Sequence, residues 1–157
     1  MFDTVLTFVA ALGSGLVGGV FFAFSSFVMP ALDRLPPEGA MAAMRSINVF
    51  APKPPFMLAM MGTALVDVAA AVFAVLDWRG SASWLVLAGC LVYLVGIVGV
   101  TAAFHVPRNN ALDSGEIDAA AARRWREYYD AWHPGNHVRS LAGIVASGLF
   151  LLALVLR

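Results

Sequence analysis

Four long apolar runs constrain this chain more than any other feature of its sequence. They cover residues 5–29, 56–76, 83–104 and 138–156, and the only charged side chains inside them are Asp67 and Arg139. Each run is close to the roughly 20 residues that a helix needs to cross about 30 Å of hydrocarbon. A helix satisfies its own backbone hydrogen bonds in lipid. The runs therefore predict an all-α integral membrane protein built as a four-helix bundle.

The composition supports this interpretation. Hydrophobic residues make up 61% of the 157 residues and charged residues 13%, about half the roughly 25% of a typical soluble domain. Ten basic residues balance ten acidic ones, which argues against a nucleic-acid-binding protein. The single cysteine, Cys90, allows neither a disulfide nor a cysteine zinc cluster. We expect one membrane domain over residues 1–157, with the lipid bilayer as a partner.

The distribution of basic residues predicts the orientation in the membrane. Four crossings put residues 30–55 and 105–137 on one side, and both termini on the other. The first two segments contain seven Lys and Arg residues, whereas the opposite side contains two. Because basic residues favour the cytoplasmic side, residues 30–55 and 105–137 should be cytoplasmic.

Each long connection should carry an amphipathic helix that caps one face of the bundle. Pro36-Pro37-Glu38 is typical of a helix start, and Pro52-Lys53-Pro54-Pro55 should stop that helix. In the second connection Trp125, Tyr128 and Trp132 recur at helical spacing. This stripe is either the buried face of an interfacial helix or an apolar lid for an aromatic ligand.

The end of the second capping helix can also be predicted. His133-Pro134-Gly135 should terminate it, and Asn136 is suited to N-cap the fourth span. Small residues predict how the spans approach one another: Gly15 and Gly19 in the first, and Gly143 and Ser147 in the fourth. Such faces would also permit a homo-oligomer.

Candidate functional residues gather on the side of the two long connections. All three histidines lie there, and His105 and His137 adjoin the third and fourth spans. They could act as general acids or bases, ligate a metal or haem, or be structural. Met57, Met60 and Met61 begin the second span on this side. Such a cluster favours adaptable packing beside a hydrophobic pocket over a Cu(I) site.

Asp67 is the one acidic residue inside a span. It lies 11 residues into the second run, about 16 Å deep at helical rise. An ionisable group at that depth is a functional candidate by default, as a proton relay or catalytic group. The alternative is a protonated or hydrogen-bonded aspartate that links the span to Thr101, Tyr93 or a serine.

One sequence pattern resembles a known family. The chain reads His105-Val-Pro-Arg-Asn-Asn-Ala-Leu112 and then Trp125-x-x-Tyr128-x-x-x-Trp132-x-x-x-Asn136-His137-x-Arg139. This pattern resembles the anthrone oxygenase-like family of small four-span membrane proteins, many of them bacterial. The resemblance covers nearly the whole chain, including residues 21–30, and implies a location in the bacterial inner membrane.

The resemblance also implies an activity. Characterised members of this family oxidise an anthrone to an anthraquinone with O₂ and without an established cofactor. We therefore expect cofactor-independent oxidation of a lipophilic aromatic, anthrone- or quinol-like substrate. The residues carried over by the motif are His105, Asn109, Trp125, Tyr128, Trp132, Asn136, His137 and Arg139.

The resemblance favours one histidine as the catalytic base. Because the family more often has Asn at position 105, His137 is preferred, with Asp67 and His105 as the other catalytic candidates. No metal ligands are assigned. The alternative function is a non-enzymatic membrane subunit or small-ligand binder, in which His105 and His137 hold haem or a metal ion.

Overall fold

The structure is a computed structural model that describes residues 2–115 and 118–156, and these residues form helices without any strand. The predicted all-α fold is confirmed. The helices are α1 (Phe2–Ala23), α2 (Met29–Leu32), α3 (Pro37–Phe50), α4 (Phe56–Leu76), α5 (Ser81–Tyr93), α6 (Val106–Ser114) and α7 (Ala121–Val155). Wider π-helical turns join some of them: Phe24–Val28 links α1 to α2, and Leu94–Gly99 and Thr101–His105 link α5 to α6.

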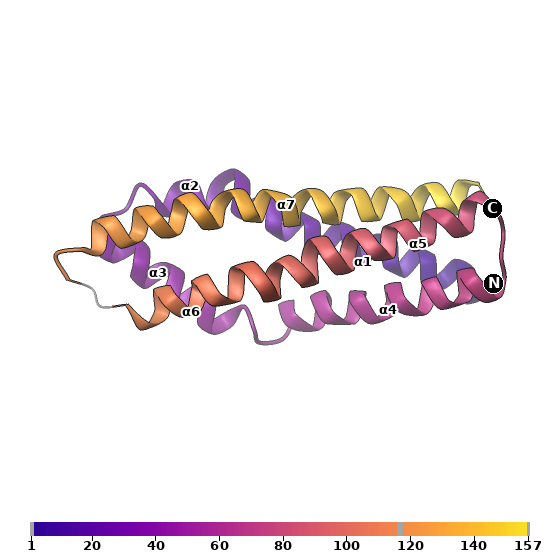
Figure 1. Ribbon diagram of the computed structural model, residues 1–157, viewed down its shortest axis with the longest axis horizontal. Helices are drawn as coiled ribbons and strands as arrows, with labels where there is room; N and C mark the ends of the chain where they lie inside the picture. The colour runs from indigo at the N-terminus through magenta and orange to yellow at the C-terminus, as the bar shows by residue number, and fades with distance from the viewer. Residues whose placement is uncertain (1, 116–117, 157) are drawn as a thin grey trace.

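The helices and turns form four continuous rods: Asp3–Leu32, Phe56–Leu76, Ser81–Ser114 and Ala121–Val155. The rods run side by side along the long axis of the molecule (Figure 1). Helix α1 packs on α7 and α4, and α5 packs on the same two neighbours, so the rods form a closed four-membered ring. Both termini lie at one end, and α3 lies at the other. This arrangement is the predicted four-helix bundle.

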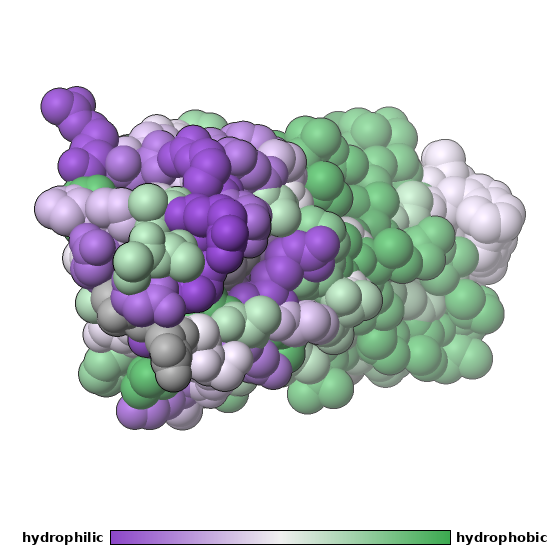
Figure 2. All heavy atoms as spheres, turned by 60° about the vertical axis from the view of Figure 1, so that its left-hand side comes forward, coloured by the Kyte–Doolittle hydropathy of each residue, from purple (hydrophilic) through white to green (hydrophobic). Residues whose placement is uncertain are grey.

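All four rods are long and apolar enough to cross a membrane. The exposed Trp78 and Trp84 mark one interface. A hydrocarbon layer of about 30 Å then covers about 20 residues of each rod. Its far boundary falls near residues 24, 56, 104 and 136. In Figure 2 hydrophilic residues gather over one end of the molecule, the end that holds α3 in Figure 1, and hydrophobic residues cover most of the remaining face, with residues of intermediate hydropathy at the opposite tip.

The predicted capping helix over residues 37–50 is confirmed as α3. It begins after Pro36, and its buried Met41 and Met44 face the start of α7. Two polar contacts tie it to the end of α6. The Arg45 guanidinium donates to the Leu112 carbonyl at 2.8 and 3.0 Å, and Asn48 Nδ2 donates to Asp113 Oδ1 at 3.0 Å.

The predicted helix end at residues 133–135 is wrong. Helix α7 runs for 35 residues through Pro134, so the second capping element is the first third of the fourth span. Pro134 removes one backbone donor, but the buried Trp132 and Asn136 hold the helix in place on either side of it. Gly135 is a contact point, because an added Cβ would collide with the ring of Phe104. Asn136 consequently lies inside the helix and is not its N-cap.

Glycines bring the backbones of α1 and α7 close together. A Cβ added to Gly143 would lie 2.5 Å from the Gly18 Cα. One turn further, Ser147 lies beside Gly15 and donates to the Ala11 carbonyl at 2.8 Å. The prediction for Gly143 and Ser147 therefore agrees with the structure. In α1 the contact uses Gly15 and Gly18, since a Cβ on Gly19 would meet no atom within 4 Å.

This contact yields a stability prediction with a matched control. Gly143→Ala must push two backbones apart, so we expect the free energy of unfolding to fall by about 1–3 kcal/mol. Gly148→Ala, on the same helix with no atom near the new methyl, should be neutral or gain up to about 1 kcal/mol from helix propensity. Unfolding titrations in mixed micelles measure both. Equal stability of the two variants would contradict this packing.

Candidate functional site

A cavity of about 530 Å³ lies between the bundle and the α3 cap. Its walls come from every rod and from α3. Most of its wall is aromatic, aliphatic or methionine side chain, including Met57 and Met60 as the methionine cluster suggested. Its polar lining residues are Ser46, Asn48, Thr101, His105, Asn109 and Arg139.

The cavity lies at the boundary of the hydrocarbon layer. Its wall includes Phe24, directly after α1, Phe56 at the start of α4, and His105 at the end of the Thr101–His105 turn. These three residues belong to different rods but reach the same depth. A ligand in the cavity would therefore have the apolar bundle on one side. On the other side it would have the polar cap, which consists of α3, α6 and the first turns of α7.

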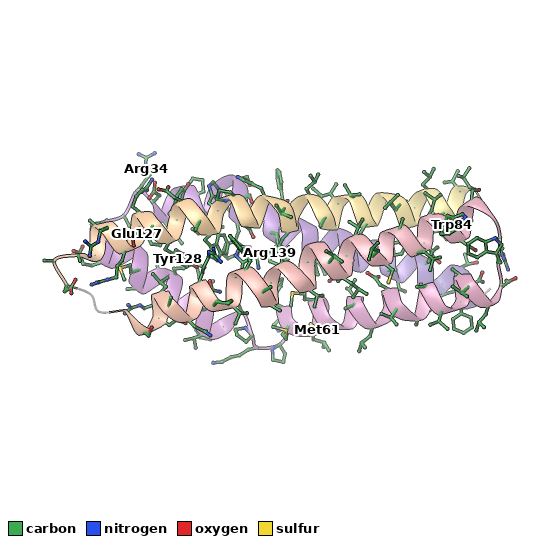
Figure 3. The ribbon with its side chains drawn as sticks, viewed as in Figure 1. Arg34, Met61, Trp84, Glu127, Tyr128 and Arg139 are labelled. Carbon is green, nitrogen blue, oxygen red and sulfur yellow. The ribbon has the colours of Figure 1, made fainter. Side chains whose placement is uncertain are left out.

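Arg139 is the main charged group of the cavity wall. Its side chain is only 5% exposed and points into the bundle (Figure 3). The guanidinium donates to Asn136 Oδ1 at 2.7 Å and to Thr101 Oγ1 at 3.3 Å, and it lies over the Phe21 ring at 4.1 Å. Its Nε has no hydrogen-bond partner among the described residues.

The charge of Arg139 has no carboxylate partner in the described part of the chain. A buried charge without a counter-ion is costly, and an arginine recognises anionic oxygens well. The arrangement can therefore stabilise negative charge on a ligand oxygen in the cavity.

Asn136 holds this arginine in place. It is completely buried, and its Nδ2 donates to the Phe21 carbonyl at 2.7 Å and to Ser25 Oγ at 2.8 Å. Its Oδ1 accepts from Arg139, so its amide has no group left for a ligand. The sequence predicts substrate binding by Asn136, whereas the structure places it behind the cavity wall, where it positions Arg139.

His105 is the other ionisable group in the wall. It is completely buried, and neither ring nitrogen makes a hydrogen bond of acceptable geometry with a described residue. The ring packs edge-on against Trp132 and Phe104, with centroids 5.0 and 5.2 Å away. An imidazole that lines a cavity and makes no well-aligned hydrogen bond there can accept a proton from a ligand or donate one to it.

Three predicted substrate-binding residues form one hydrogen-bonded group. Asn109 Oδ1 accepts from Tyr128 Oη at 2.8 Å and from Trp132 Nε1 at 3.0 Å. Asn109 and Trp132 line the cavity, whereas Tyr128 is buried behind them. Tyr128 and Trp132 thus fix the Asn109 amide, which leaves its Nδ2 for a ligand.

His137 does not line the cavity. Its side chain is exposed and stacks on His133 with ring centroids 4.5 Å apart. His105 is completely buried in the cavity wall, whereas His137 faces outward. The structure therefore does not bring the two histidines together as a pair of ligands in the cavity. Among the described residues, no three His, Cys, Asp or Glu side chains form a group suited to a metal ion.

Trp125 belongs to the polar cap and not to the cavity. Its Nε1 donates to Asp33 Oδ1 at 2.8 Å, and Arg126 forms an ion pair with the same carboxylate. The hydrogen bond from Arg126 is the main cause that holds the pKa of Asp33 below its usual range. These contacts fasten the start of α7 to the end of the first rod.

Asp67 lies apart from the cavity. It is two helical turns beyond Met60, about 10 Å deeper at helical rise, and is completely buried. Neither carboxyl oxygen has a hydrogen-bond partner among the described residues. The proposed link to Thr101 or Tyr93 is absent from that part of the chain, since Thr101 accepts from Arg139 and Tyr93 Oη donates to the Met60 carbonyl at 2.9 Å.

The isolation of this carboxyl gives a second prediction. Asp67→Leu removes a polar group without partners, so we expect the free energy of unfolding to rise by about 1–3 kcal/mol. Turnover should stay within about twofold of the unsubstituted protein, because the cavity is unchanged. The more conservative Asp67→Asn serves as the control. Loss of turnover in both variants, with folding intact, would restore a functional role for Asp67.

Sequence reasoning did not find several residues of the cavity wall. Thr101, Phe21 and Phe24 lie at the ends of apolar spans, where their types carry no special signal. Only their similar depth in different spans could have indicated that they line one cavity. The π-helical turns had no recognisable sequence signature, yet they carry Phe24, Thr101 and His105, and such turns are frequent at functional sites.

Comparison with known proteins identifies the family. The model of the family described as anthrone oxygenase matches residues 56–149, more than half of the chain. The match includes four of the six polar cavity residues, Thr101, His105, Asn109 and Arg139. The other two, Ser46 and Asn48, lie in α3 and outside the matched range. Neither a curated protein nor a solved structure matches the chain. The chain belongs to the anthrone oxygenase family.

Proposed function

We propose that this protein oxidises a lipophilic, anthrone-like aromatic ketone with O₂ in the cavity below α3. The observation that carries the proposal is that one apolar cavity is lined by a buried arginine and a buried histidine, and that among the described residues the arginine has no carboxylate partner and the histidine no well-aligned hydrogen bond. The volume of about 530 Å³ falls within the range of pockets that hold drug-sized ligands. The family assignment supports the same substrate class.

The proposed chemistry begins with proton removal. His105 takes a proton from the methylene carbon opposite the ketone, and the electron pair moves into the rings to give an enolate. Arg139 stabilises the negative charge on the enolate oxygen. An apolar surrounding strengthens that interaction relative to water.

Oxidation then follows from the electron-rich anion. The anion gives one electron to O₂, and the radical pair combines to form a carbon–oxygen bond, which yields a peroxide. The imidazolium of His105 returns its proton to the peroxide. Loss of the second methylene proton breaks the oxygen–oxygen bond, so that anthrone plus O₂ becomes anthraquinone plus water.

The other wall residues orient the substrate. The Trp132 ring offers a flat surface for an aromatic ligand, and the Asn109 Nδ2 can donate to a ring substituent. Since basic residues are concentrated in residues 30–55 and 105–137, we also propose that the cavity lies on the cytoplasmic side of a bacterial inner membrane.

The test uses ¹⁸O₂ with protein reconstituted in lipid vesicles and anthrone as the substrate. We expect one ¹⁸O atom in each anthraquinone molecule and the other in water, with one O₂ consumed per product. The control is an equal amount of heat-inactivated protein, which measures autoxidation. Product formation no faster than this control would refute the proposed function.

A further inference from the structure

The cavity has a mouth, and three of its four exposed lining residues are apolar: Phe50, Pro52 and Val106, with Ser46 as the fourth. Phe50, at the end of α3, and Val106, at the start of α6, both line the cavity. Their side chains are nevertheless 66% and 44% exposed. The contact between Asn48 and Asp113 holds the ends of α3 and α6 near each other. Because both residues line the cavity and are also exposed, we describe Phe50 on α3 and Val106 on α6 as the two lips of the mouth.

The surroundings of the mouth indicate what it faces. Val49 beside Phe50 is 56% exposed, and Leu58 in the first turn of α4 is 70% exposed. An apolar surface of this kind is unfavourable in water but not in lipid. Val106 lies about two residues beyond the hydrocarbon boundary, so the mouth is at the depth of the interfacial layer.

Cationic side chains flank both lips, as is typical of this layer. The Lys53 ammonium lies 4.7 Å from the centre of the Phe50 ring. On the other lip the Arg108 guanidinium lies 3.5 Å from the centre of the Phe104 ring. Such side chains cover apolar surface with their stems and place their charge among lipid headgroups.

We infer that the cavity opens sideways into the interfacial layer of the bilayer, between Phe50 and Val106, and exchanges its ligand with the lipid. A lipophilic aromatic molecule with a polar oxygen resides in that layer. It would pass through the mouth with its rings against Phe50 and its oxygen directed to Arg139. The ligand assigned to the mouth rests on the proposed function, whereas the direction in which the mouth opens does not.

Spin labelling tests the direction of the mouth without requiring turnover. Nitroxides are attached to Phe50→Cys and Val106→Cys in a Cys90→Ala background, in vesicles, and their accessibility to O₂ and to a water-soluble nickel chelate is measured. Leu65→Cys provides the lipid control and Arg123→Cys the water control, since these side chains are 73% and 73% exposed. We expect several-fold lower nickel accessibility at 50 and 106 than at 123, with high O₂ accessibility.

Two results would overturn the inference. Nickel accessibility equal to that at 123 would mean that the mouth faces water. Low accessibility to both reagents would mean that protein, such as a second copy, covers it. If the labels are accessible from lipid but anthrone is not oxidised, the lateral mouth stands and the proposed function fails.

A second variant tests passage of the ligand. Val106→Trp enlarges a side chain at the mouth while Arg139 and His105 themselves are retained, so uptake of anthrone from the vesicle lipid should slow several-fold and raise KM. Leu65→Trp, on the lipid-facing side of α4, is the matched control and should behave as the unsubstituted protein. Equal KM values for the two variants would show that the ligand uses another route.

Discussion

Replacing Arg139 by methionine should lower kcat/KM for anthrone oxidation by about 100- to 1,000-fold, the usual cost of losing one donor to a developing oxyanion. Methionine fills much of the same space but cannot stabilise negative charge. The enolate would then form in an apolar cavity with no cation beside it. Arg139→Lys should recover part of the activity, because it restores the charge without the paired geometry of the guanidinium.

The stability of the same variant separates a functional arginine from a structural one. Arg139→Met removes a buried charge that has no carboxylate partner, which offsets the loss of its bond to Asn136 Oδ1. We expect the free energy of unfolding to change by no more than about 2 kcal/mol. Arg123→Met, at a side chain 73% exposed on the cap, is the matched control. Arg139→Met with unchanged kcat/KM would exclude the proposed oxyanion role.

Replacing His105 by asparagine should lower kcat by about 100- to 10,000-fold, the range attributed to a positioned general base. Asparagine is close in size but cannot take the methylene proton. Ligand binding should change much less, because the Trp132 and Arg139 side chains remain in the wall. The measurement is single-turnover oxidation together with equilibrium binding of anthrone in anaerobic vesicles.

Two comparisons make this prediction specific. Added imidazole should restore part of the activity to His105→Ala, since that variant leaves space for the lost ring beside Gly135. His137→Asn decides between the two histidines, and we expect near-normal turnover because His137 is exposed. A large loss in His137→Asn with little effect in His105→Asn would return the base to His137.

The sequence was sufficient for the bundle because lipid leaves few choices. Apolar runs of the right length must be helices. Three of the predicted spans lie within the observed rods, and the fourth, residues 138–156, ends one residue beyond Val155. The helix over residues 37–50 was bracketed by prolines and was also predictable. The error at residues 133–135 has a physical cause, since a proline that breaks an isolated helix is tolerated where neighbouring rods hold both sides.

The site was less predictable because the sequence does not show which way each side chain points. Sequence places a residue at a depth, but a helix can turn it toward the cavity or away from it. His105 and His137 share a depth and differ only in direction, and Asn136 and Arg139 share a face but only Arg139 reaches the cavity. His105 ends a π-helical turn, Thr101–His105, which affects the direction of its side chain and had no signature in the sequence.

O₂ uptake is the decisive measurement for anthrone oxidation in the cavity beside Arg139 and His105. Purified protein in lipid vesicles is given anthrone while an oxygen electrode and anthraquinone absorbance are followed together. We expect O₂ uptake well above that of heat-inactivated protein and equimolar with anthraquinone. In Arg139→Met and His105→Asn this uptake should be nearly abolished. Uptake equal in all four preparations would contradict the proposed function.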